Sequence, residues 1–309
     1  PHPRPDGTPT LAAFGFPRAV DWAVVADQEE ADAYFALGVM VRNLIIWLSA
    51  GLGVAAVGAL FFSLGISRPI LRIGATVVEV PTTGADGFAV DPDAMLAAIT
   101  ARTRAVIVNS PCNPTGGRIS PAAMTVIIEG CAAHGVLVIS DETYERFVYD
   151  GAEPFSAASL AERFPETVVV VGSFSKTYAM TGWRLGYLMG PRELVDAAAT
   201  IQSHATSNAT SFAMVGALAA LEHAEPEVEK MIVEYEARRD LLIPHLNALP
   251  GFRCLPPAGA FYAFPDVSAC FRTDDGGEPE GSTRFAERLL EEAQVAVVAG
   301  AAFGGDNYI

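Results

Sequence analysis

Thr167-Val168-Val169-Val170-Val171-Gly172-Ser173-Phe174-Ser175-Lys176 is the stretch that decides the fold. Its β-branched run predicts a strand over Thr167–Gly172 that is buried on both faces, as in a parallel sheet. The strand leads directly into a short polar segment that ends in Lys176, and Lys230 is the only other lysine of the chain. Because parallel sheets place their functional loops at the carboxyl ends of strands, Lys176 is a candidate for lysine chemistry.

Two earlier apolar runs end in the same way. Ala105–Asn109 is followed by Ser110-Pro111-Cys112-Asn113-Pro114-Thr115-Gly116-Gly117, and Val136–Ser140 is followed by Asp141-Glu142-Thr143-Tyr144. Taken singly, the first loop is ordinary turn chemistry, Asp141 is a helix cap and Lys176 is a surface lysine. All three occur in order at strand ends, and this recurrence favours a shared functional site.

The rest of residues 73–309 alternates between predicted helices and strands, which indicates an α/β fold. We expect a mainly parallel sheet with helices on both faces, followed by a small α+β C-terminal domain. Helix starts are marked by Asp91-Pro92 and Ser120-Pro121, since Asp and Ser cap helices and Pro suits the first turn. The predicted helices are Asp91–Ala101, Ser120–Gly135, Pro226–Leu246 and Thr283–Ala293, and the further strands are Thr76–Val80, Leu185–Met189, Phe261–Phe264 and Val295–Val298.

Composition excludes several classes of function. The formal net charge of -16 argues against a nucleic-acid surface, which needs clustered Lys and Arg. The four cysteines and five histidines are dispersed without metal-ligand spacing, so we expect no metal site and read the cysteines as reduced thiols.

Leu44–Ile66 contains no charged residue and is long enough to cross a bilayer, which needs about 20 apolar residues. Arg68 and Arg72 follow it, so the downstream side is expected to be cytoplasmic. The alternative is a buried core helix. Residues 1–72 as a whole resemble the end of an extracytoplasmic sensor domain with its transmembrane helix and the start of a HAMP linker. The resemblance is carried by the sequence in which these parts follow one another and by Ser67-Arg68-Pro69-Ile70.

From about Ile73 the sequence resembles the class I aminotransferases of the pyridoxal-phosphate (PLP) fold type I, in the aspartate-aminotransferase-like branch. The motifs are the Asn-Pro-Thr-Gly turn, the Asp-x-x-Tyr pair, Ser-x-Ser-Lys, and Gly182-Trp183-Arg184-Leu185-Gly186. The resemblance implies amino-group transfer between an amino acid and a 2-oxo acid, with PLP as cofactor and a homodimer as the assembly.

The resemblance also implies a role for each site residue. Lys176 would carry PLP through a Schiff base and move the proton of the substrate Cα. Asp141 would pair with the pyridine nitrogen. Asn113 and Tyr144 would hydrogen-bond the ring 3-oxygen. The phosphate would be held by Ser173 and Arg184, with a further contact from Ser175.

Several parts of the family pattern have no counterpart in the sequence. These are an early strand with a glycine-alanine phosphate turn, an aromatic residue that stacks on the ring, an N-terminal arm, and the arginine that binds the substrate carboxylate. We therefore expect a fused or truncated gene product whose large domain is incomplete and whose catalytic competence is low. The expected organisation is a sensor-like segment (1–43), a transmembrane helix (44–66), a linker (67–72), a PLP-binding large domain (73–235) and a truncated small domain (236–309). The aminotransferase-like part is expected in the cytoplasm, anchored to the inner membrane.

Three other functions fit parts of the sequence. Ser173-Phe174-Ser175-Lys176 matches the Ser-x-x-Lys pattern of serine acyl-enzymes, but the Lys-Thr-Gly that should follow is missing. A membrane sensor fragment without enzymatic activity would explain the first seventy residues. A PLP-dependent lyase or synthase on the same fold would share every cofactor motif, since a fold does not fix its reaction.

Overall fold

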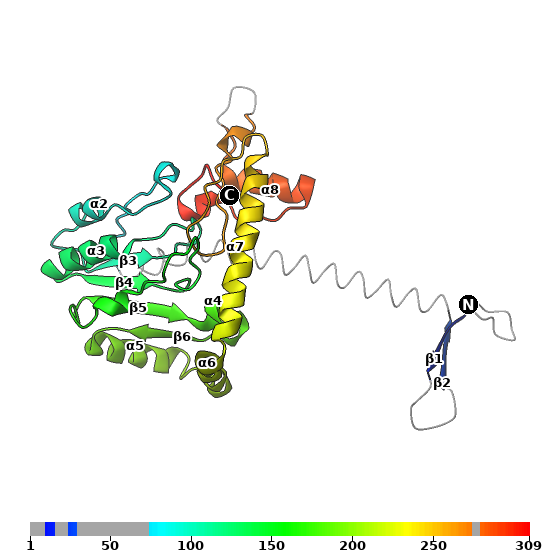
Figure 1. The fold of residues 1–309 in the computed structure, drawn as a ribbon, viewed down its shortest axis with the longest axis horizontal. Coiled ribbons are helices and arrows are strands. Elements are labelled where there is room, and N and C mark those ends of the chain that lie inside the picture. The colour runs from blue at the N-terminus through cyan, green and yellow to red at the C-terminus, as the bar shows by residue number, and fades with distance from the viewer. Residues whose placement is uncertain (1–9, 16–23, 30–73, 274–278) are drawn as a thin grey trace. The chain divides into compact units, whose positions relative to one another are not determined.

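The computed structural model of the protein describes residues 10–15, 24–29, 74–273 and 279–309. The chain divides into two compact units, Pro1–Pro69 and Ile70–Ile309 (Figure 1). In the first unit, β1 (Thr10–Gly15) and β2 (Val24–Glu29) pair antiparallel. The predicted membrane span Leu44–Ile66 lies outside the described residues. Among the residues that are described, no helix is both long and apolar enough to cross a bilayer.

The second unit is built on a sheet in the order β3-β4-β5-β6. Its strands are β3 (Ala105–Asn109), β4 (Leu137–Asp141), β5 (Val168–Ser173) and β6 (Gly186–Met189). β3, β4 and β5 run parallel, as predicted, whereas β6 runs antiparallel to β5 with Ser173 opposite Gly186. The segment 174–185 between β5 and β6 contains only the single turns Phe174–Thr177 and Thr181–Trp183 in place of a long crossover helix, so the chain returns antiparallel beside β5.

One face of the sheet is covered by α2 (Pro92–Ala97) and α3 (Pro121–Ala133). Both helices start where the sequence predicted, with Asp91 Oδ1 accepting from the amides of Asp93 and Ala94, and Ser120 Oγ accepting from the amide of Ala123. The main core lies here and is made of fully buried aliphatic side chains, among them Ile127 and Ile128 of α3 and Val138 of β4.

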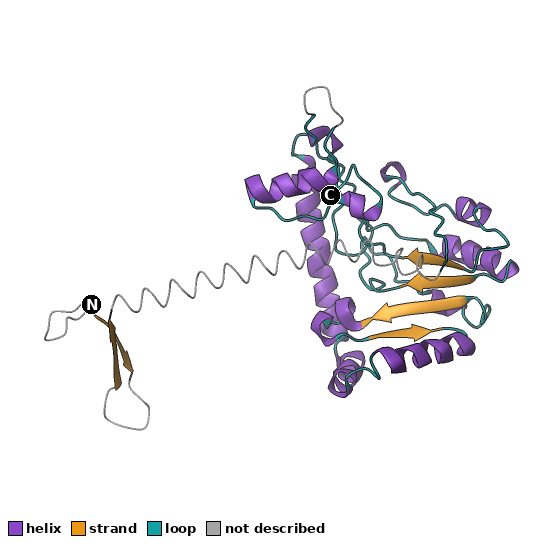
Figure 2. Ribbon diagram, turned by 180° about the vertical axis from the view of Figure 1, so that it is seen from behind, coloured by secondary structure: helices purple, strands orange, loops and turns teal. Residues whose placement is uncertain are grey.

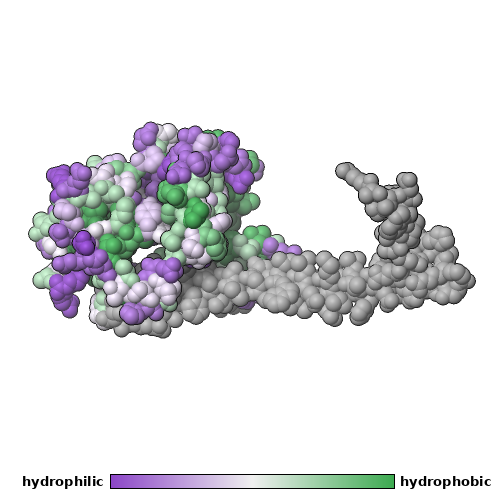
Figure 3. Space-filling view, turned by 90° about the horizontal axis from the view of Figure 1, so that it is seen from below, coloured by the Kyte–Doolittle hydropathy of each residue, from purple (hydrophilic) through white to green (hydrophobic). Residues whose placement is uncertain are grey.

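The expectation of a sheet covered on both faces is wrong for the outer strands of the described sheet. Ile107 of β3 is 49% exposed, and every residue of β6 is exposed. The two helices that follow β6, α5 (Arg192–Ala205) and α6 (Ser211–His223), were not predicted. They leave large apolar side chains such as Ile201, Phe212 and Val215 about 70% exposed. Figure 3 views the unit from the α5–α6 side and shows hydrophobic patches on this face.

Helix α7 (Glu225–Asn247) passes the carboxyl ends of the parallel strands (Figure 2). Its Met231, Ile232 and Tyr235 pack on a second buried cluster formed by Tyr144, Phe147 and Ala260. Arg239 of the same helix donates to both carboxylate oxygens of Asp150 at 2.8 Å and to the carbonyl oxygen of Pro257 at 3.3 Å. The predicted domain boundary at 235/236 falls inside this continuous helix and stays a prediction.

Three of the predicted strands do not form. Thr76–Val80, Phe261–Phe264 and Val295–Val298 lie outside the named strands because no neighbouring strand pairs with them along their length. The C-terminal part is instead tied together by α8 (Ser282–Ala293) and by single bridges such as Asp266 with Tyr308. The remaining short helices are α4 (Phe174–Thr177), η1 (Gly84–Asp86), η2 (Ala157–Leu160), η3 (Thr181–Trp183), η4 (Ser268–Cys270) and η5 (Gly300–Phe303).

Candidate active site

Three polar residues end the three parallel strands side by side. Asn109 closes β3, Asp141 closes β4 and Ser173 closes β5. Asn109 stands opposite Asp141 in the β3–β4 register, and Asp141 stands opposite Val171 of β5. The tertiary structure therefore brings the three predicted loops to one edge of the sheet, as the sequence predicted from the direction of the strands.

Asn109 is a site residue that the sequence reasoning missed. Its side-chain Nδ2 donates to the carbonyl oxygen of Asp141 at 3.1 Å, and its Oδ1 accepts from the backbone amide of Asn113 at 2.8 Å. One amide side chain thus fixes the loop that carries Asn113 against the end of β4. The available signal was a polar side chain that ends an otherwise apolar strand.

The Asn-Pro-Thr-Gly turn packs directly on the Pro257–Phe261 segment. Gly116 has φ +67°, and a Cβ added to it would lie 2.2 Å from the Cβ of Pro257. Its carbonyl oxygen accepts from the amide of Gly259 at 3.0 Å. A Cβ on Gly259 would in turn lie 2.6 Å from the carbonyl oxygen of Phe147. Only glycine permits this close approach of backbones, so both glycines are needed to place Asn113 beside the aromatic cluster.

Tyr144 is buried beside Asp141 and forms a hydrogen bond between its hydroxyl and that of Tyr262. Burial raises the pKa of Tyr144 well above its ordinary value, and the Tyr262 hydrogen bond and the charge of Asp141 raise it further, while a hydrogen bond with Asn113 lowers it. The phenol therefore stays protonated and can act as a hydrogen-bond donor.

Lys176 lies on α4, the single turn that follows β5. Its Nζ is 5.9 Å from the ring centre of Tyr144 and 5.6 Å from that of Phe261. The side chain is half-buried, and within the described part of the chain no carboxylate lies within ion-pair distance of it. Lys230, by contrast, is exposed on α7 and pairs with Glu227 at 2.7 Å. Among the described residues Lys176 is therefore the lysine that is held in no ion pair and that lies beside the aromatic rings at the strand ends, which favours it over Lys230 as the nucleophile.

The turn that carries Lys176 is fixed at both ends. Ser173 Oγ accepts from the amide of Ser175 at 3.1 Å and so caps the turn, and Thr181 Oγ1 donates to the carbonyl oxygen of Ser175 at 2.9 Å. Ser175 is itself 9% exposed, which leaves little of it open to a ligand. The Ser173 hydroxyl hydrogen is not used by the cap and can be donated to an anion.

Arg184 stands at the start of β6, beside the end of β5. The amide of Phe174 donates to the carbonyl oxygen of Leu185 at 3.2 Å, which brings the two chain segments together. The Arg184 side chain is exposed, and its Nη1 donates to the carbonyl oxygen of Thr181 at 3.1 Å. Since a guanidinium has five N–H donors, several remain for an anion at this corner.

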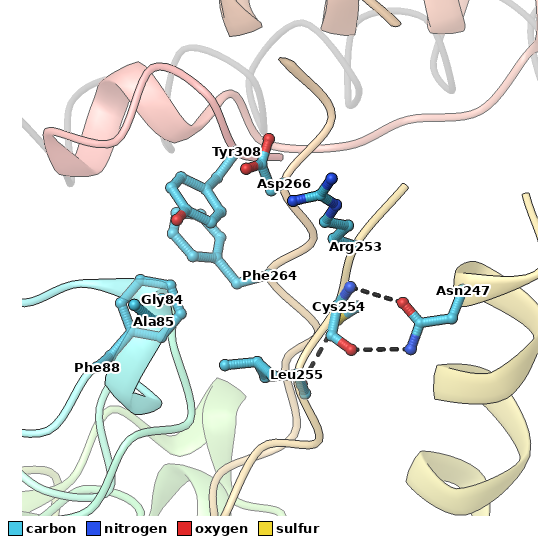
Figure 4. A pocket seen from close by; sticks show the side chains of 10 residues that line it. All are labelled: Gly84, Ala85, Phe88, Asn247, Arg253, Cys254, Leu255, Phe264, Asp266 and Tyr308. Carbon is cyan, nitrogen blue, oxygen red and sulfur yellow. Dashed lines mark hydrogen bonds between the residues drawn. The ribbon is translucent and has the colours of Figure 1, made fainter. Parts of the chain in front are cut away.

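The hollow drawn in Figure 4 is a different place. It measures about 450 Å³, and none of its lining residues is a predicted site residue. The rings of Phe264 and Tyr308 stack in it at 4.8 Å, and Asn247 forms two hydrogen bonds with the backbone of Cys254. We assign the chemistry to the strand-end site, because the hollow is lined by neither of the two lysines and by no residue of the three strand-end loops.

The fold and the strand-end site together define a class. Within the described residues, an α/β sheet presents at its carboxyl edge a lysine without an ion-pair partner, next to a carboxylate, a protonated phenol, and the hydroxyl and guanidinium donors of Ser173 and Arg184. This is the arrangement of enzymes in which a lysine amine carries a carbonyl cofactor.

Comparisons with known proteins give the family. A sequence profile described as aminotransferase class I and II matches residues 66–308. The aspartate aminotransferase of Geobacillus stearothermophilus is 38% identical over 242 residues, or 76% of this chain and 59% of that protein. The probable aspartate/prephenate aminotransferase of Aquifex aeolicus is 40% identical over 238 residues, with the same coverage of 76% and 59%. A Thermus thermophilus aspartate aminotransferase solved with maleate has a TM-score of 0.68 at 38% identity and covers 76% of this chain and 59% of its own.

The chain belongs to the class I and II aminotransferase family. It spans about 59% of the length of the curated relatives that it matches. The family is PLP-dependent, and the residues described above fit that cofactor. Lys176 offers the amine, Asp141 a carboxylate and Tyr144 a donor hydroxyl. Ser173 offers an O–H group and Arg184 offers N–H groups to a phosphate.

Proposed function

We propose that this chain carries the PLP-binding core of an enzyme that transfers an amino group between an amino acid and a 2-oxo acid. The observation that supports this most directly is the position of Lys176 Nζ, which faces the rings of Tyr144 and Phe261. The relatives quoted above are named aspartate or aspartate/prephenate aminotransferases, so aspartate is the amino donor to test first.

Each site residue has a defined task in this proposal. When bound, PLP would supply an aromatic ring that accepts electrons from the substrate Cα. Lys176 Nζ would carry the cofactor and would accept the proton at the substrate Cα. Asp141 would hold a proton on the ring nitrogen, and Tyr144 and Asn113 would donate to the ring 3-oxygen. Ser173 and Arg184 would hold the phosphate, with Ser175, which is 9% exposed, as a further contact.

The assignment of Lys176 can be tested by borohydride reduction in the presence of PLP, followed by peptide mapping. We expect the label on the peptide that contains Lys176. Lys230 is an internal control, because it is paired with Glu227 and exposed. A label on Lys230, or on neither lysine, would rule the assignment out.

The 309 residues alone are expected to turn over slowly. Their match spans 59% of the Geobacillus relative, and apolar side chains such as Ile107 and Phe212 are exposed in the described unit. A substrate that is not held in place loses the rate advantage of proximity. A coupled assay with aspartate and 2-oxoglutarate on the purified chain tests this, and turnover in the ordinary enzyme range of about 10 s⁻¹ would contradict it.

We further propose that Leu44–Ile66 crosses a membrane as one helix, with the aminotransferase unit on the cytoplasmic side. The support is the uncharged length of the run and the arginines that follow it. Recovery of the expressed chain entirely in the soluble fraction would contradict this. We also propose that the chain forms a homodimer, as the resemblance to the aminotransferase family implies. Sedimentation of the detergent-solubilised chain measures its oligomeric state.

A further inference from the structure

Glu145 links the two halves of the candidate site. It follows Tyr144 directly in the chain, and its Oε1 accepts a hydrogen bond from Thr177 Oγ1 at 3.3 Å. Thr177 follows Lys176 directly and is 1% exposed. The bond joins two segments: residues 141–146, which carry Asp141 and Tyr144, and the turn that carries Lys176. In the part of the chain that the structure describes, it is the only side-chain hydrogen bond between these two segments.

The second carboxyl oxygen of Glu145, Oε2, is buried and has no hydrogen-bond partner among the residues that the structure describes. The charged and titratable groups that face this carboxyl are Glu142, Arg146, Tyr178 and Tyr187. Arg146 does not neutralise it, because its guanidinium is engaged with both carboxylate oxygens of Glu225. A buried oxygen without a donor is costly when it carries charge, so the neutral acid is the form that suits this place.

The protonation of the carboxyl follows from this environment. Burial is the main cause that raises the pKa of Glu145, from 4.5 to about 7, and Glu142 raises it further, while the hydrogen bond from Thr177 and the charge of Arg146 lower it. Glu145 therefore changes its charge near neutral pH, within hydrogen-bond distance of the Lys176 turn. No task in the proposed reaction uses this group.

We propose that Glu145 is a positioning residue for the cofactor lysine, because through Thr177 it fixes the turn that carries Lys176 against the segment that carries Asp141 and Tyr144. The inference rests on the proposed function. α4 has four residues and is held along the chain by Ser173 and Thr181, so the bond from Thr177, its last residue, adds the side-chain link to the segment that carries Tyr144. Ionisation of Glu145 strengthens the hydrogen bond from Thr177, which is why that bond lowers the pKa, but it also leaves Oε2 as an uncompensated buried charge, so the contact that holds the turn changes as pH rises through neutrality.

The test measures reductive labelling of Lys176 in the full chain as a function of PLP concentration and pH. Thr177→Val removes the donor and is expected to raise the PLP concentration for half-labelling about tenfold, the ratio for loss of one good hydrogen bond. Thr177→Ser keeps the hydroxyl, so its PLP concentration for half-labelling is expected to equal that of the wild type. Glu145→Gln keeps an acceptor oxygen but cannot ionise, so it should label like the wild type in acid and lack the wild-type inflection near neutral pH. Glu129→Gln, an exposed residue of α3 paired with Arg163, makes the same change of charge elsewhere and should alter nothing.

The outcomes separate the two proposals. A wild type that labels neither lysine refutes the proposed function and this inference with it. If the wild type is labelled at Lys176, two results refute only the positioning role. One is that Thr177→Val and Thr177→Ser are labelled alike, and the other is that Glu145→Gln keeps the inflection near neutral pH. If Thr177→Val is poorly folded by circular dichroism, the comparison of Glu145→Gln with the wild type decides, since a structural role alone would not remove the inflection.

Discussion

The contact between the Asn-Pro-Thr-Gly turn and the Pro257–Phe261 segment allows one substitution to be predicted in detail, Gly116→Ala. Gly116 has φ +67°, where an L-residue costs about 1 kcal/mol. The added Cβ would lie 2.2 Å from Pro257 Cβ and 2.8 Å from the carbonyl oxygen of Gly259, which is backbone and cannot rotate away. The two segments must separate, at a cost of about 2 kcal/mol for overpacking, and the hydrogen bond from Gly259 weakens by about 1 kcal/mol. We expect the free energy of unfolding to fall by about 4 kcal/mol.

Gly135→Ala is the matched control. Gly135 has nearly the same conformation, φ +65°, but a Cβ there would meet nothing within 4 Å. It should lose about 1 kcal/mol at most, because alanine also restricts the unfolded chain. Urea unfolding followed by circular dichroism gives both values from the midpoints, provided the slopes agree. If Gly116→Ala costs no more than Gly135→Ala, the contact with Pro257 does not matter and the assignment of this glycine to close approach is wrong.

Three further predictions concern charged groups. Arg239→Ala should lower the free energy of unfolding by about 2 kcal/mol, because the buried Arg239 side chain loses its packing and hydrogen bonds, whereas Asp150, whose side chain is 70% exposed, is solvated by water when its partner is gone. Because Arg239 lowers the pKa of Asp150, the ionic part of this loss should be full above the ordinary pKa range of Asp and shrink as pH falls through the lowered pKa, as urea midpoints across pH would show. The pKa of Glu145 is raised from 4.5 to about 7, so its contribution to stability is present below pH 4.5 and is lost as pH rises through about 7. The free energy of unfolding of Glu145→Gln should therefore rise relative to that of the wild type across this pH window, by up to about 3 kcal/mol. A difference between the two proteins that does not change with pH would contradict the raised pKa. Asp141→Asn should retain part of the PLP absorbance but lose most of whatever transamination rate the wild type shows, and an unchanged rate would exclude Asp141 as the partner of the ring nitrogen.

Local signals were sufficient for the elements of the main core. The caps at Asp91 and Ser120 begin α2 and α3, and the apolar runs before Asn113, Asp141 and Lys176 form β3, β4 and β5. These features are determined by neighbouring residues, because a cap satisfies amides two or three positions away and a strand buried on both faces reads as a continuous apolar run. The convergence of the three loops followed from the parallel direction of the strands.

The sequence alone therefore determined the parallel strands β3, β4 and β5 and indicated Lys176 as the candidate lysine. Only the tertiary structure decided that Phe261–Phe264 is not a strand, because strand pairing depends on residues far apart in the chain, and that β6 runs antiparallel, because an apolar run has the same pattern in either direction. The same holds for the bonds that hold the site, those of Asn109 to Asp141 and of Glu145 to Thr177. Such contacts join residues more than thirty positions apart, through a side chain and a backbone carbonyl in the first case and through two side chains in the second, and no local pattern encodes them.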